Sequence, residues 1–545
     1  MRPCLLLLSL LCCVSVTAAP PEVKSLHPMG ARIGSTTEIT VDGKLNQPGT
    51  SVWCSEASLT FEVPESGNTF QVTIPGDVVP GLYWVRFFND QGATGLLPFV
   101  VGTLPEADEV EPNNEVAQVQ KIEQSSVVNG KLGAAGDVDL YAVPMKKEQT
   151  LVAAVDSNWR LAAPVDMVMQ ILDPNGTVIH QNDDDHGFDP LLTVTAPTDG
   201  TWYVRVFGFP AKPNSTIGYA GGADYRYRLT LTTGPFANHA VPSVVADDSD
   251  LVQLVGWNLS DATEQPVSAS RLAGDALGLA EVANTVPVLK RAGLIVVEKE
   301  PCDRSKPIGI SADATICGVI DRPRDEDVFQ FTAKKGERIN FRVESRSLGY
   351  PLDPVVTVID AAGRNVVESD DAARNIFDSL LKFKAAADGD YRVCIRDLFE
   401  HGGWRFAYRL HCEIPAPSVD LTVKADVFTV EQGELLEIPV TVTRNEKYVE
   451  EFPVSVEGLP AGVTVEAVVS QATGDSAKEV KLKLKADSKT GFHGPIRIVG
   501  SLTDNAKTVA SAPLGTFKTS TEYLWLTVTA EKDSAEKKEG SKTGT

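Results

Sequence analysis

Six side chains in two short segments carry oxygen atoms that could bind a metal ion. They are Glu109, Glu111, Asn113, Asn114, Asp137 and Asp139. Alternate side chains of a strand share a face, so Asp137 and Asp139 lie on the same side of an extended segment. Calcium binds about six to eight hard oxygen ligands from carboxylates, amides and carbonyls. The types and number of these residues therefore predict a calcium site.

The same residues also fit a purely structural role. Asn113, Asn114 and Asp137 are of types that form turns, because their side chains accept hydrogen bonds from nearby backbone amides. The sequence leaves both interpretations open.

A similar acidic set recurs further along the chain. It consists of Glu298, Glu300, Asp303, Asp325 and Asp327, with Cys302 at the position of an Asn of the first set. Because one oxygen ligand is exchanged for sulfur, we expect calcium at the first set in preference to the second.

Two further acidic loops carry less information. Asp183, Asp184, Asp185 and Asp189 are mirrored by Asp370, Asp371 and Asp378. Their spacing does not fit the EF-hand, which needs a Gly at the sixth position and a Glu at the twelfth. We interpret both as solvated or turn-forming loops.

The chain lacks the short motifs of common hydrolases. It contains no H-E-x-x-H, G-x-S-x-G, Walker or C-x-x-C motif, and its 7 histidines show no metal-ligand spacing. Gly49, Thr50 and Ser51 faintly resemble a subtilase serine motif, but Val52 and Trp53 follow and no matching His or Asp segment exists. We therefore predict a protein without catalytic activity.

The first 19 residues have the layout of a secretory signal peptide, with Arg2, an apolar run and small residues at Ala18 and Ala19. A lipoprotein signal is the alternative, although Leu11 rather than Gly or Ala precedes Cys12. We predict a secreted, periplasmic or cell-surface protein. No later apolar run reaches the roughly 18 residues that span a bilayer, so we expect no integral membrane segment.

The chain is acidic, with 73 Asp and Glu against 50 Lys and Arg and a formal net charge of −23. Such a surface repels nucleic acids and anionic membranes, and we expect no nucleic-acid partner.

Four cysteines lie in the region of the second acidic set, and export makes disulfides possible. Cys394 and Cys412 flank Gly402 and Gly403, where a hairpin would place them on facing strands. We predict that pair. Cys302 and Cys317 stand where the matching earlier stretch of the chain has Asn113 and Asn129, so they could form a second cross-link. Cys54 is left as a small buried residue.

Two stretches of the chain repeat the same order of landmarks. The first reads EVEPNN, GDVDLYAV and DGTWYVRV, and the second reads EKEPCD, DEDVFQFT and DGDYRVCI. Short apolar runs between Gly-rich and Pro-rich turns predict β-strands, and the shared order indicates one β-sandwich used twice. We assign residues 105–233 to the first repeat and 298–414 to the second.

Aromatic residues gather near the end of each repeat. They are Trp202, Tyr203, Tyr225, Tyr227, Tyr391, Trp404 and Tyr408. They belong either to the core, the commoner fate of strand aromatics, or to an exposed face that binds a glycan or a matrix protein.

The repeated pattern resembles the bacterial pre-peptidase C-terminal (PPC) domain, a jelly-roll-like module attached to secreted proteases and other exported proteins. In the collagen-binding members of that family, the E-x-E-P-N-N and D-x-D positions hold calcium. The resemblance therefore implies the same ligand set: Glu109, Glu111, Asn113, Asn114, Asp137 and Asp139.

The flanking segments have the pattern of immunoglobulin-like (Ig-like) sandwiches. Residues 20–104, opening with HPMGARIGSTTEITVDGKL, resemble IPT/TIG domains, and residues 415–530, with VEGLPAGVTV, resemble bacterial Ig-like modules. Residues 234–297 are either a truncated Ig-like domain or a linker, and residues 531–545 are a disordered tail. The predicted fold is all-β, a tandem array of Ig-like and jelly-roll-like β-sandwich domains.

These features favour an exported, non-catalytic protein for binding, adhesion or scaffolding, stabilised by calcium. Its partner would be an extracellular protein, a matrix or a glycan. An alternative is an accessory, non-catalytic component of a secreted peptidase or other hydrolase, and a third is a stalk that binds nothing. The sequence predicts no oligomeric state.

Overall fold

The computed structural model describes residues 19–45, 49–212, 218–260, 266–487, 491–503 and 506–530. All but the last residue of the predicted signal peptide, and the whole predicted tail, lie outside this range. Regular structure in the described residues is almost entirely strand, and their one α-helix is α1 (Asn158–Leu161). The predicted all-β fold is therefore confirmed. Nowhere in these ranges is a helix long and apolar enough to cross a membrane.

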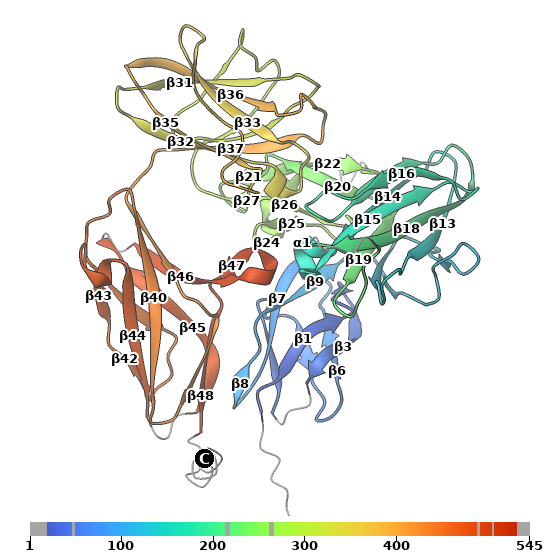
Figure 1. Cartoon of the computed structure of the whole chain (residues 1–545), viewed down its shortest axis with the longest axis horizontal. Helices are drawn as coiled ribbons and strands as arrows, with labels where there is room; N and C mark the ends of the chain where they lie inside the picture. The colour runs from blue at the N-terminus through green and yellow to red at the C-terminus, as the bar shows by residue number, and fades with distance from the viewer. Residues whose placement is uncertain are drawn as a thin grey trace, which may run out of the picture.

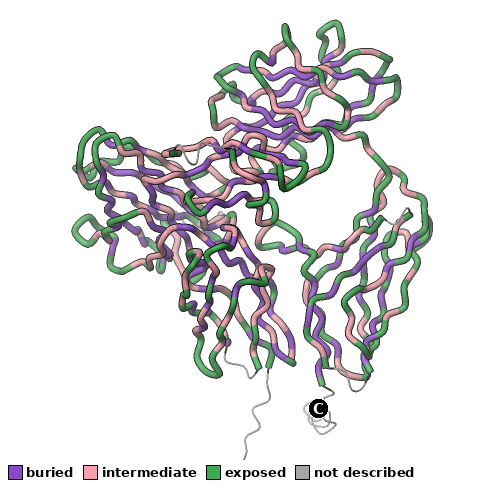
Figure 2. The backbone as a smooth tube through the Cα atoms, turned by 180° about the vertical axis from the view of Figure 1, so that it is seen from behind, coloured by how far each residue is buried: buried purple, intermediate pink, exposed green. Residues whose placement is uncertain are grey.

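Strands close in sequence pack into five large apolar clusters within the described residues, with one small cluster beside them. The buried strands run through the interior of each unit (Figure 2). The units do not form a straight array. The C-terminal unit returns to lie beside the N-terminal one, so the chain closes on itself (Figure 1).

Each repeat is a sandwich of two five-stranded sheets. In the first repeat, one sheet has the order β10 (Glu106–Asp108), β12 (Ser126–Lys131), β19 (Arg226–Thr232), β14 (Thr150–Asp156) and β17 (Leu191–Thr195). The facing sheet has the order β11 (Gln120–Lys121), β13 (Asp139–Met145), β18 (Gly200–Pro210), β15 (Val165–Leu172) and β16 (Val178–Asn182).

The second repeat has the same topology. One sheet has the order β28 (Ile295–Val297), β30 (Thr315–Val319), β37 (Ala407–Glu413), β32 (Arg338–Glu344) and β35 (Ser379–Lys384). The other has the order β29 (Ile308–Gly309), β31 (Asp327–Ala333), β36 (Gly389–Asp397), β33 (Pro354–Asp360) and β34 (Asn365–Ser369).

The disulfide between Cys394 and Cys412 is a wrong prediction. β36 and β37 do not form a hairpin, because β36 lies between β31 and β33 while β37 lies in the opposite sheet. Cys412 packs in the core between the sheets, whereas Cys394 packs with Val328 and Ile359 on the other face of its sheet. Cys394 therefore points away from its expected partner.

The cross-link between Cys302 and Cys317 is wrong for a similar reason. Cys302 and Ile316 both belong to the core. Cys317 follows Ile316 on the same strand, and since successive side chains point to opposite faces, Cys317 points out of the sandwich. Its sulfur lies 3.5 Å from Ser243 Oγ, outside the repeat. All five cysteines in the described residues are free thiols. Burial raises the pKa of Cys302 and of Cys394 to about 12, so both remain protonated.

The N-terminal unit is also a two-sheet sandwich. One sheet has the order β1 (Glu22–His27), β3 (Thr36–Lys44), β6 (Thr69–Thr73) and β5 (Thr60–Glu62). The other has the order β2 (Gly30–Arg32), β9 (Leu97–Gly102), β7 (Gly81–Asn89) and β4 (Ser51–Cys54), with β8 (Gly92–Ala93) beside β7.

Short strands between the repeats form a small middle unit around their own apolar cluster. They are β20 (Phe236–Val241), β21 (Val244–Val245), β22 (Leu251–Trp257), β23 (Val267–Ser268), β24 (Leu272–Ala273), β25 (Ala276–Gly278), β26 (Thr285–Pro287) and β27 (Leu289–Lys290). This unit lies at the centre of the molecule, in contact with both repeats (Figure 1).

The C-terminal unit is a continuous twisted sheet folded over one core. Its main path has the order β39 (Val427–Glu431), β48 (Leu524–Thr529), β45 (Phe492–Ser501), β46 (Lys507–Leu514), β38 (Ser418–Thr422), β40 (Leu435–Asn445), β44 (Glu479–Ala486) and β42 (Val463–Val465). Three strands join at its sides, β41 (Phe452–Glu457), β43 (Val468–Ser470) and β47 (Thr519–Thr521).

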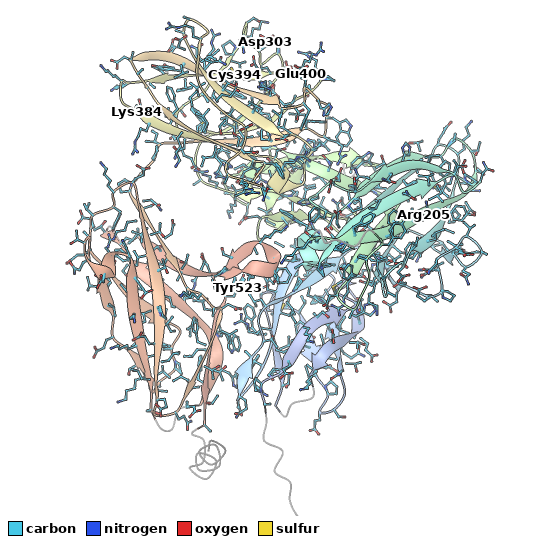
Figure 3. The ribbon with its side chains drawn as sticks, viewed as in Figure 1. Arg205, Asp303, Lys384, Cys394, Glu400 and Tyr523 are labelled. Atoms are coloured by element: carbon cyan, nitrogen blue, oxygen red, sulfur yellow. The ribbon has the colours of Figure 1, made fainter. Side chains whose placement is uncertain are left out.

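A buried ion pair joins the first and last units. The Arg86 side chain, 1% exposed, contacts the Asp426 carboxylate, and it donates to the Tyr523 carbonyl at 3.2 Å. Aromatic rings surround this pair, with Trp53 5.2 Å from Tyr523 between centroids and Arg86 5.6 Å above Trp525. Figure 3 shows Tyr523 at the boundary of the two units.

Buried charges join the middle unit to the second repeat. Arg409, 3% exposed, donates from Nε to Ser243 Oγ at 3.1 Å. Its guanidinium also lies 3.8 Å from Glu344, and the same carboxylate is 3.1 Å from His411 Nε2 and contacts Arg342. Burial alone would raise the pKa of Glu344, but His411, Arg342 and Arg409 together lower it to about 2.

Replacing Asp426 with Ala leaves the Arg86 charge buried without a counter-ion. Breaking one side of a buried pair is expected to destabilise the contact by about 3 kcal/mol. Small-angle scattering should show a larger radius of gyration for Asp426→Ala, and amide exchange should speed up in β48. The control is Glu466→Ala, an exposed carboxylate of the same unit. An unchanged radius and unchanged exchange would contradict the ring-closing role of Arg86.

Glu344 should make the contact between the middle unit and the second repeat sensitive to acid. Because its pKa is lowered in the folded state, its contribution to stability is present above the ordinary pKa of 4.5 and is lost as the pH falls toward 2. Glu344→Gln should be less stable at neutral pH and should lose less stability across that window. Glu400→Gln, at an exposed site, should keep the wild-type profile when melting is followed by calorimetry.

Candidate metal centre

The segment between β10 and β11 crosses the start of β13 and carries the first acidic set. Two backbone hydrogen bonds fix its path, since Glu109 N donates to the Asn129 carbonyl at 3.0 Å and Leu140 N donates to the Asn113 carbonyl at 3.1 Å. Asp139 is the first residue of β13. The local fold therefore brings Glu109, Glu111 and Asn113 to the end of a core strand.

Three carboxylates meet at this point. One oxygen atom each of Glu109, Glu111 and Asp139 lies within 4.8 Å of the others. Asn113 is held among them, because its backbone amide donates to Glu111 Oε2 at 2.9 Å and its Nδ2 donates to Glu109 Oε1 at 3.4 Å. Four of the six predicted ligands are thus brought together.

Asp137 and Asn114 do not join the cluster in the same way. Asp137 accepts hydrogen bonds from the backbone amides of Gly133 (2.6 Å) and Val138 (3.1 Å), so its carboxylate holds its own turn. Asn114 is exposed. Asp137 therefore has the turn-forming role that the sequence left open, whereas Asn113 lies in the cluster of acids.

Two buried oxygen atoms of the cluster have no hydrogen-bond partner among the described residues. They are Asn113 Oδ1 and Asp139 Oδ1, both on side chains that are 0% exposed. Buried polar atoms are nearly always paired, because an unpaired one loses its hydration without compensation. Unpaired acceptor oxygens among three carboxylates are the donor set that a hard cation requires.

A tyrosine from the opposite sheet holds the other oxygen of Asp139. Tyr227, on β19, donates its hydroxyl to Asp139 Oδ2 at 2.5 Å, and the Tyr141 hydroxyl lies 2.6 Å from that of Tyr227. Both rings are fully buried. The hydrogen bond therefore joins the two sheets of the sandwich across the core.

Crowding and burial change the charge state of these acids. Burial raises the pKa of Asp139, and the hydrogen bond and charge of the neighbouring Glu109 raise it further. Burial also raises the pKa of Glu109. A nearby cation would have the opposite effect, because it favours the ionised form.

The second repeat has the same arrangement with one substitution. Tyr408 donates to Asp327 Oδ2 at 2.6 Å, and the Cys302 amide donates to Glu300 Oε2 at 3.1 Å, as the Asn113 amide does to Glu111. Two overlapping groups of potential ligands are found: Glu298, Cys302 and Asp327, and Glu300, Asp325 and Asp327.

The acids of the second repeat are also buried without full pairing. Asp327 Oδ1 and Glu298 Oε1 have no hydrogen-bond partner among the described residues. Burial raises the pKa of Asp327 to about 9 and that of Glu298 to about 7. The Cys302 sulfur lies within 4.8 Å of one oxygen each of Glu298 and Asp327, and its thiol also donates to the Val328 carbonyl at 3.4 Å.

The sequence did not identify Tyr227 and Tyr408 as partners of the acids. The segments YRYRL and FAYRL place a tyrosine at the same position of both repeats, which was the available signal. Most of the aromatic residues near the end of each repeat belong to the core, including Trp202 and Tyr391. Of the two roles considered for them, core packing therefore fits better than an exposed binding face.

The acidic loops have a structural use. Asp189 accepts hydrogen bonds from the backbone amides of Ser157, Asn158 and Trp159 at 3.0, 2.8 and 3.0 Å. Asp378 accepts from Ser345 N at 2.9 Å in the second repeat. One Asp of each loop therefore anchors the chain after a core strand.

The two tyrosines allow a matched comparison. Tyr227→Phe leaves both Asp139 and Tyr141 without a partner, whereas Tyr408→Phe affects Asp327 alone, because Phe329 stands where the first repeat has Tyr141. Each buried group left unpaired costs roughly 1–3 kcal/mol.

We therefore expect Tyr227→Phe to destabilise its repeat more than Tyr408→Phe does. Hydrogen exchange of β13 and β31 in a chelator measures the two repeats separately. Tyr203→Phe, on a half-buried ring, serves as the control. Equal effects in the two repeats would contradict the role given to the Tyr141 hydroxyl.

Comparison with known proteins agrees with the repeated geometry. The family described as the bacterial pre-peptidase C-terminal domain matches residues 137–208 and 325–397. A probable subtilase-type serine protease of Deinococcus radiodurans is 38% identical over 96 residues, which are 17% of this chain and 13% of that protein. The chain thus spans only a small part of that relative.

A solved structure of the pre-peptidase C-terminal domain of collagenase from Bacillus anthracis is also similar. It is 15% identical with a TM-score of 0.16, and the match covers 19% of this chain and 91% of that domain. The family match falls once in each repeated sandwich. The chain therefore contains two bacterial pre-peptidase C-terminal domains, at residues 137–208 and 325–397.

Proposed function

We propose that this protein is an exported, non-catalytic binding or scaffolding protein whose PPC domains are stabilised by calcium. The observation that carries the calcium proposal is the pair of buried, unpaired oxygens, Asn113 Oδ1 and Asp139 Oδ1, beside Glu109 and Glu111. The same position of the second repeat supports it, with unpaired oxygens on Asp327 and Glu298.

Calcium suits this donor set better than softer metals. The first cluster offers carboxylate and amide oxygens, which hard cations prefer, and neither His nor Cys belongs to its group. A cation here would compensate the burial of Asp139 and the mutual repulsion of the acids. It would also tie the segment before β11 to the start of β13.

The first repeat should bind calcium more tightly than the second. Cys302 takes the place of Asn113, so one hard oxygen ligand is exchanged for a sulfur that contacts the Val328 carbonyl. Asp325 compensates in part, because it approaches Glu300 and Asp327 while it also accepts a hydrogen bond from Asp321 N at 3.1 Å, as Asp137 does from Gly133 N.

The class of the domains and their arrangement support the proposed binding role. PPC domains accompany exported proteins, and here both pack on the central unit and contact each other through Arg405 and Asp185 (Figure 1). Such an arrangement holds several surfaces at fixed positions, as a scaffold for an extracellular protein, matrix or glycan requires.

A second candidate is an accessory part of a secreted peptidase. The similarity to a probable subtilase-type serine protease over 96 residues favours it. In this case the chain would associate with a separate catalytic protein. Peptide turnover by the purified chain that Ser51→Ala abolishes would overturn both candidates, because each assigns it no catalytic role.

Calcium titration of the full chain tests the proposal. We expect calorimetry to show binding, and the melting temperature of the chelated protein to rise by several degrees when calcium is restored in excess. Asp139→Asn and Glu109→Gln should each weaken binding at the first repeat at least ten-fold. Glu123→Gln, an exposed carboxylate of the same repeat, should leave it unchanged.

Two results would contradict the proposal. One is a titration without heat and without a change in melting temperature. The other is binding that Asp139→Asn and Asp327→Asn together leave intact, which would place the calcium elsewhere in the chain.

A further inference from the structure

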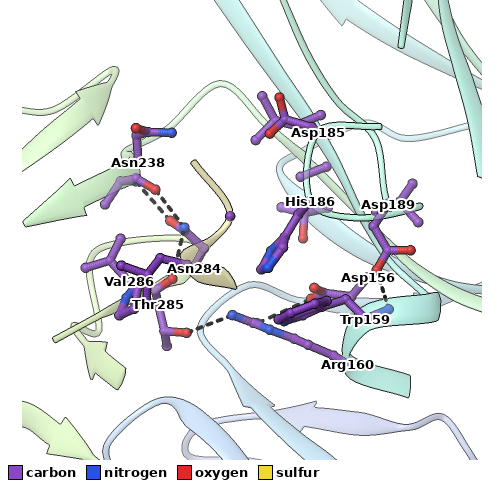
Figure 4. Close-up of a pocket in the computed structure, with 18 of the residues that line it drawn as sticks. Asp156, Trp159, Arg160, Asp185, His186, Asp189, Asn238, Asn284, Thr285 and Val286 are labelled. Atoms are coloured by element: carbon purple, nitrogen blue, oxygen red, sulfur yellow. Dashed lines mark hydrogen bonds and ion pairs between the residues drawn. The ribbon is translucent and has the colours of Figure 1, made fainter. Parts of the chain in front are cut away.

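A cavity of about 220 Å³ lies where the two repeats and the middle unit meet. The first repeat contributes α1 and the loop at Asp185–Asp189, the middle unit contributes β26, and the second repeat contributes the turn at Ser347–Gly349. None of its residues belongs to the calcium clusters. Figure 4 shows the labelled side chains of this cavity around its centre.

Contacts between the units hold the cavity together. Arg405 of the second repeat donates to both oxygens of Asp185 in the first, at 2.9 and 2.8 Å. Arg160 of the first repeat donates to Thr285 Oγ1 of the middle unit at 3.2 Å. Gly349 has a φ of +85°, and a Cβ on it would lie 2.7 Å from His186 Nδ1, so glycine allows this close approach.

The charges of the wall disfavour an ionic ligand. Acidic residues outnumber basic ones in the lining, which opposes an anion. Three of the acids already have donors, since Asp185 pairs with Arg405, Asp156 lies 3.4 Å from Arg160, and Asp189 accepts three backbone amides. A cation at any of these three acids would have to displace its partners.

His186 presents an unused hydrogen-bonding atom. Its Nε2 is buried and has no partner among the described residues. Burial lowers the pKa of His186 to about 3, so the ring is neutral and each nitrogen either donates or accepts. A hydroxyl group pairs with either tautomer, because it both donates and accepts.

An aromatic surface adjoins this atom. Trp159 packs on His186 with 4.3 Å between ring centroids and remains 36% exposed. Indole rings pack against apolar C–H surfaces and leave polar groups to their neighbours. A ligand for this wall therefore combines hydroxyl groups with a C–H face.

We propose that the cavity binds one ring of a neutral saccharide. Its volume suits a single ring, since it far exceeds the roughly 15 Å³ that one water needs and is smaller than the roughly 300 Å³ of a drug-sized pocket. Hydroxyls of the ring contact His186 Nε2 and the acceptor oxygens of the wall. The C–H face lies against Trp159.

Ligand-observed NMR and calorimetry on the full chain test this site, with glucose, galactose and N-acetylglucosamine as probes. At least one should bind with a Kd of about 1 mM, the range expected for so small a ligand. Glucosamine and glucuronate, which carry opposite charges, should each bind at least ten-fold more weakly. Trp159→Ala and His186→Ala should each weaken binding at least ten-fold.

Matched variants separate recognition from folding. Tyr219→Ala and His180→Ala change an exposed aromatic and an exposed histidine of the same repeat and should leave saccharide binding unchanged. His186→Gln should retain more binding than His186→Ala, because it keeps a donor and an acceptor. Unchanged calcium binding shows that each variant is folded, and a chelator should not remove the saccharide response.

The proposal fails if no neutral probe binds at up to about 50 mM while calcium binding is normal. It also fails if Trp159→Ala and His186→Ala retain full affinity, or if crystals soaked with the probes hold only water in the cavity. The first result would leave the calcium proposal intact.

Discussion

The two repeats depend on a carboxylate buried at the start of a central strand. Asp139 and Asp327 are 0% exposed, and each accepts a hydrogen bond from a tyrosine of the opposite sheet. Burying a carboxylate is unfavourable unless it is protonated, hydrogen-bonded or placed beside a cation. In each repeat, the segment before this strand carries further acidic side chains and folds over the buried carboxylate. That constraint explains why the segment follows the same path in both repeats.

The differences between the repeats change how that constraint is met. The first repeat has Asn113 and the Tyr141 hydroxyl near its acid, so its cluster is rich in oxygen atoms. The second repeat has Cys302 and Phe329 at these positions, and a larger part of its core is apolar there. It retains four acids around the same point. The second PPC domain thus relies more on packing, and the first relies more on polar contacts.

Local patterns predicted the strands, the repeat and four residues that meet in the cluster of acids, because alternation and turn residues act within a few positions of the chain. The fold of each sandwich depends on longer connections. Cys394 and Cys412 looked like hairpin partners, yet their strands lie in opposite sheets, since each pairs with strands far away in sequence. The cavity and the Arg86 ion pair join units that are hundreds of positions apart, and no short pattern marks Trp159 or Asp426 as a partner of distant residues.

The closure of the chain has a mechanical consequence. β1 begins and β48 ends at the same edge of the molecule (Figure 1). Tension applied across these two ends would act first on the contact of Trp53 with Tyr523 and on the ion pair of Arg86 with Asp426. Until this contact between the first and last units breaks, the repeats and the middle unit would bear no tension. The molecule would then lengthen by separating its last unit from its first, while the contacts of Arg405 with Asp185 and of Arg409 with Ser243 still hold the repeats to each other and to the middle unit.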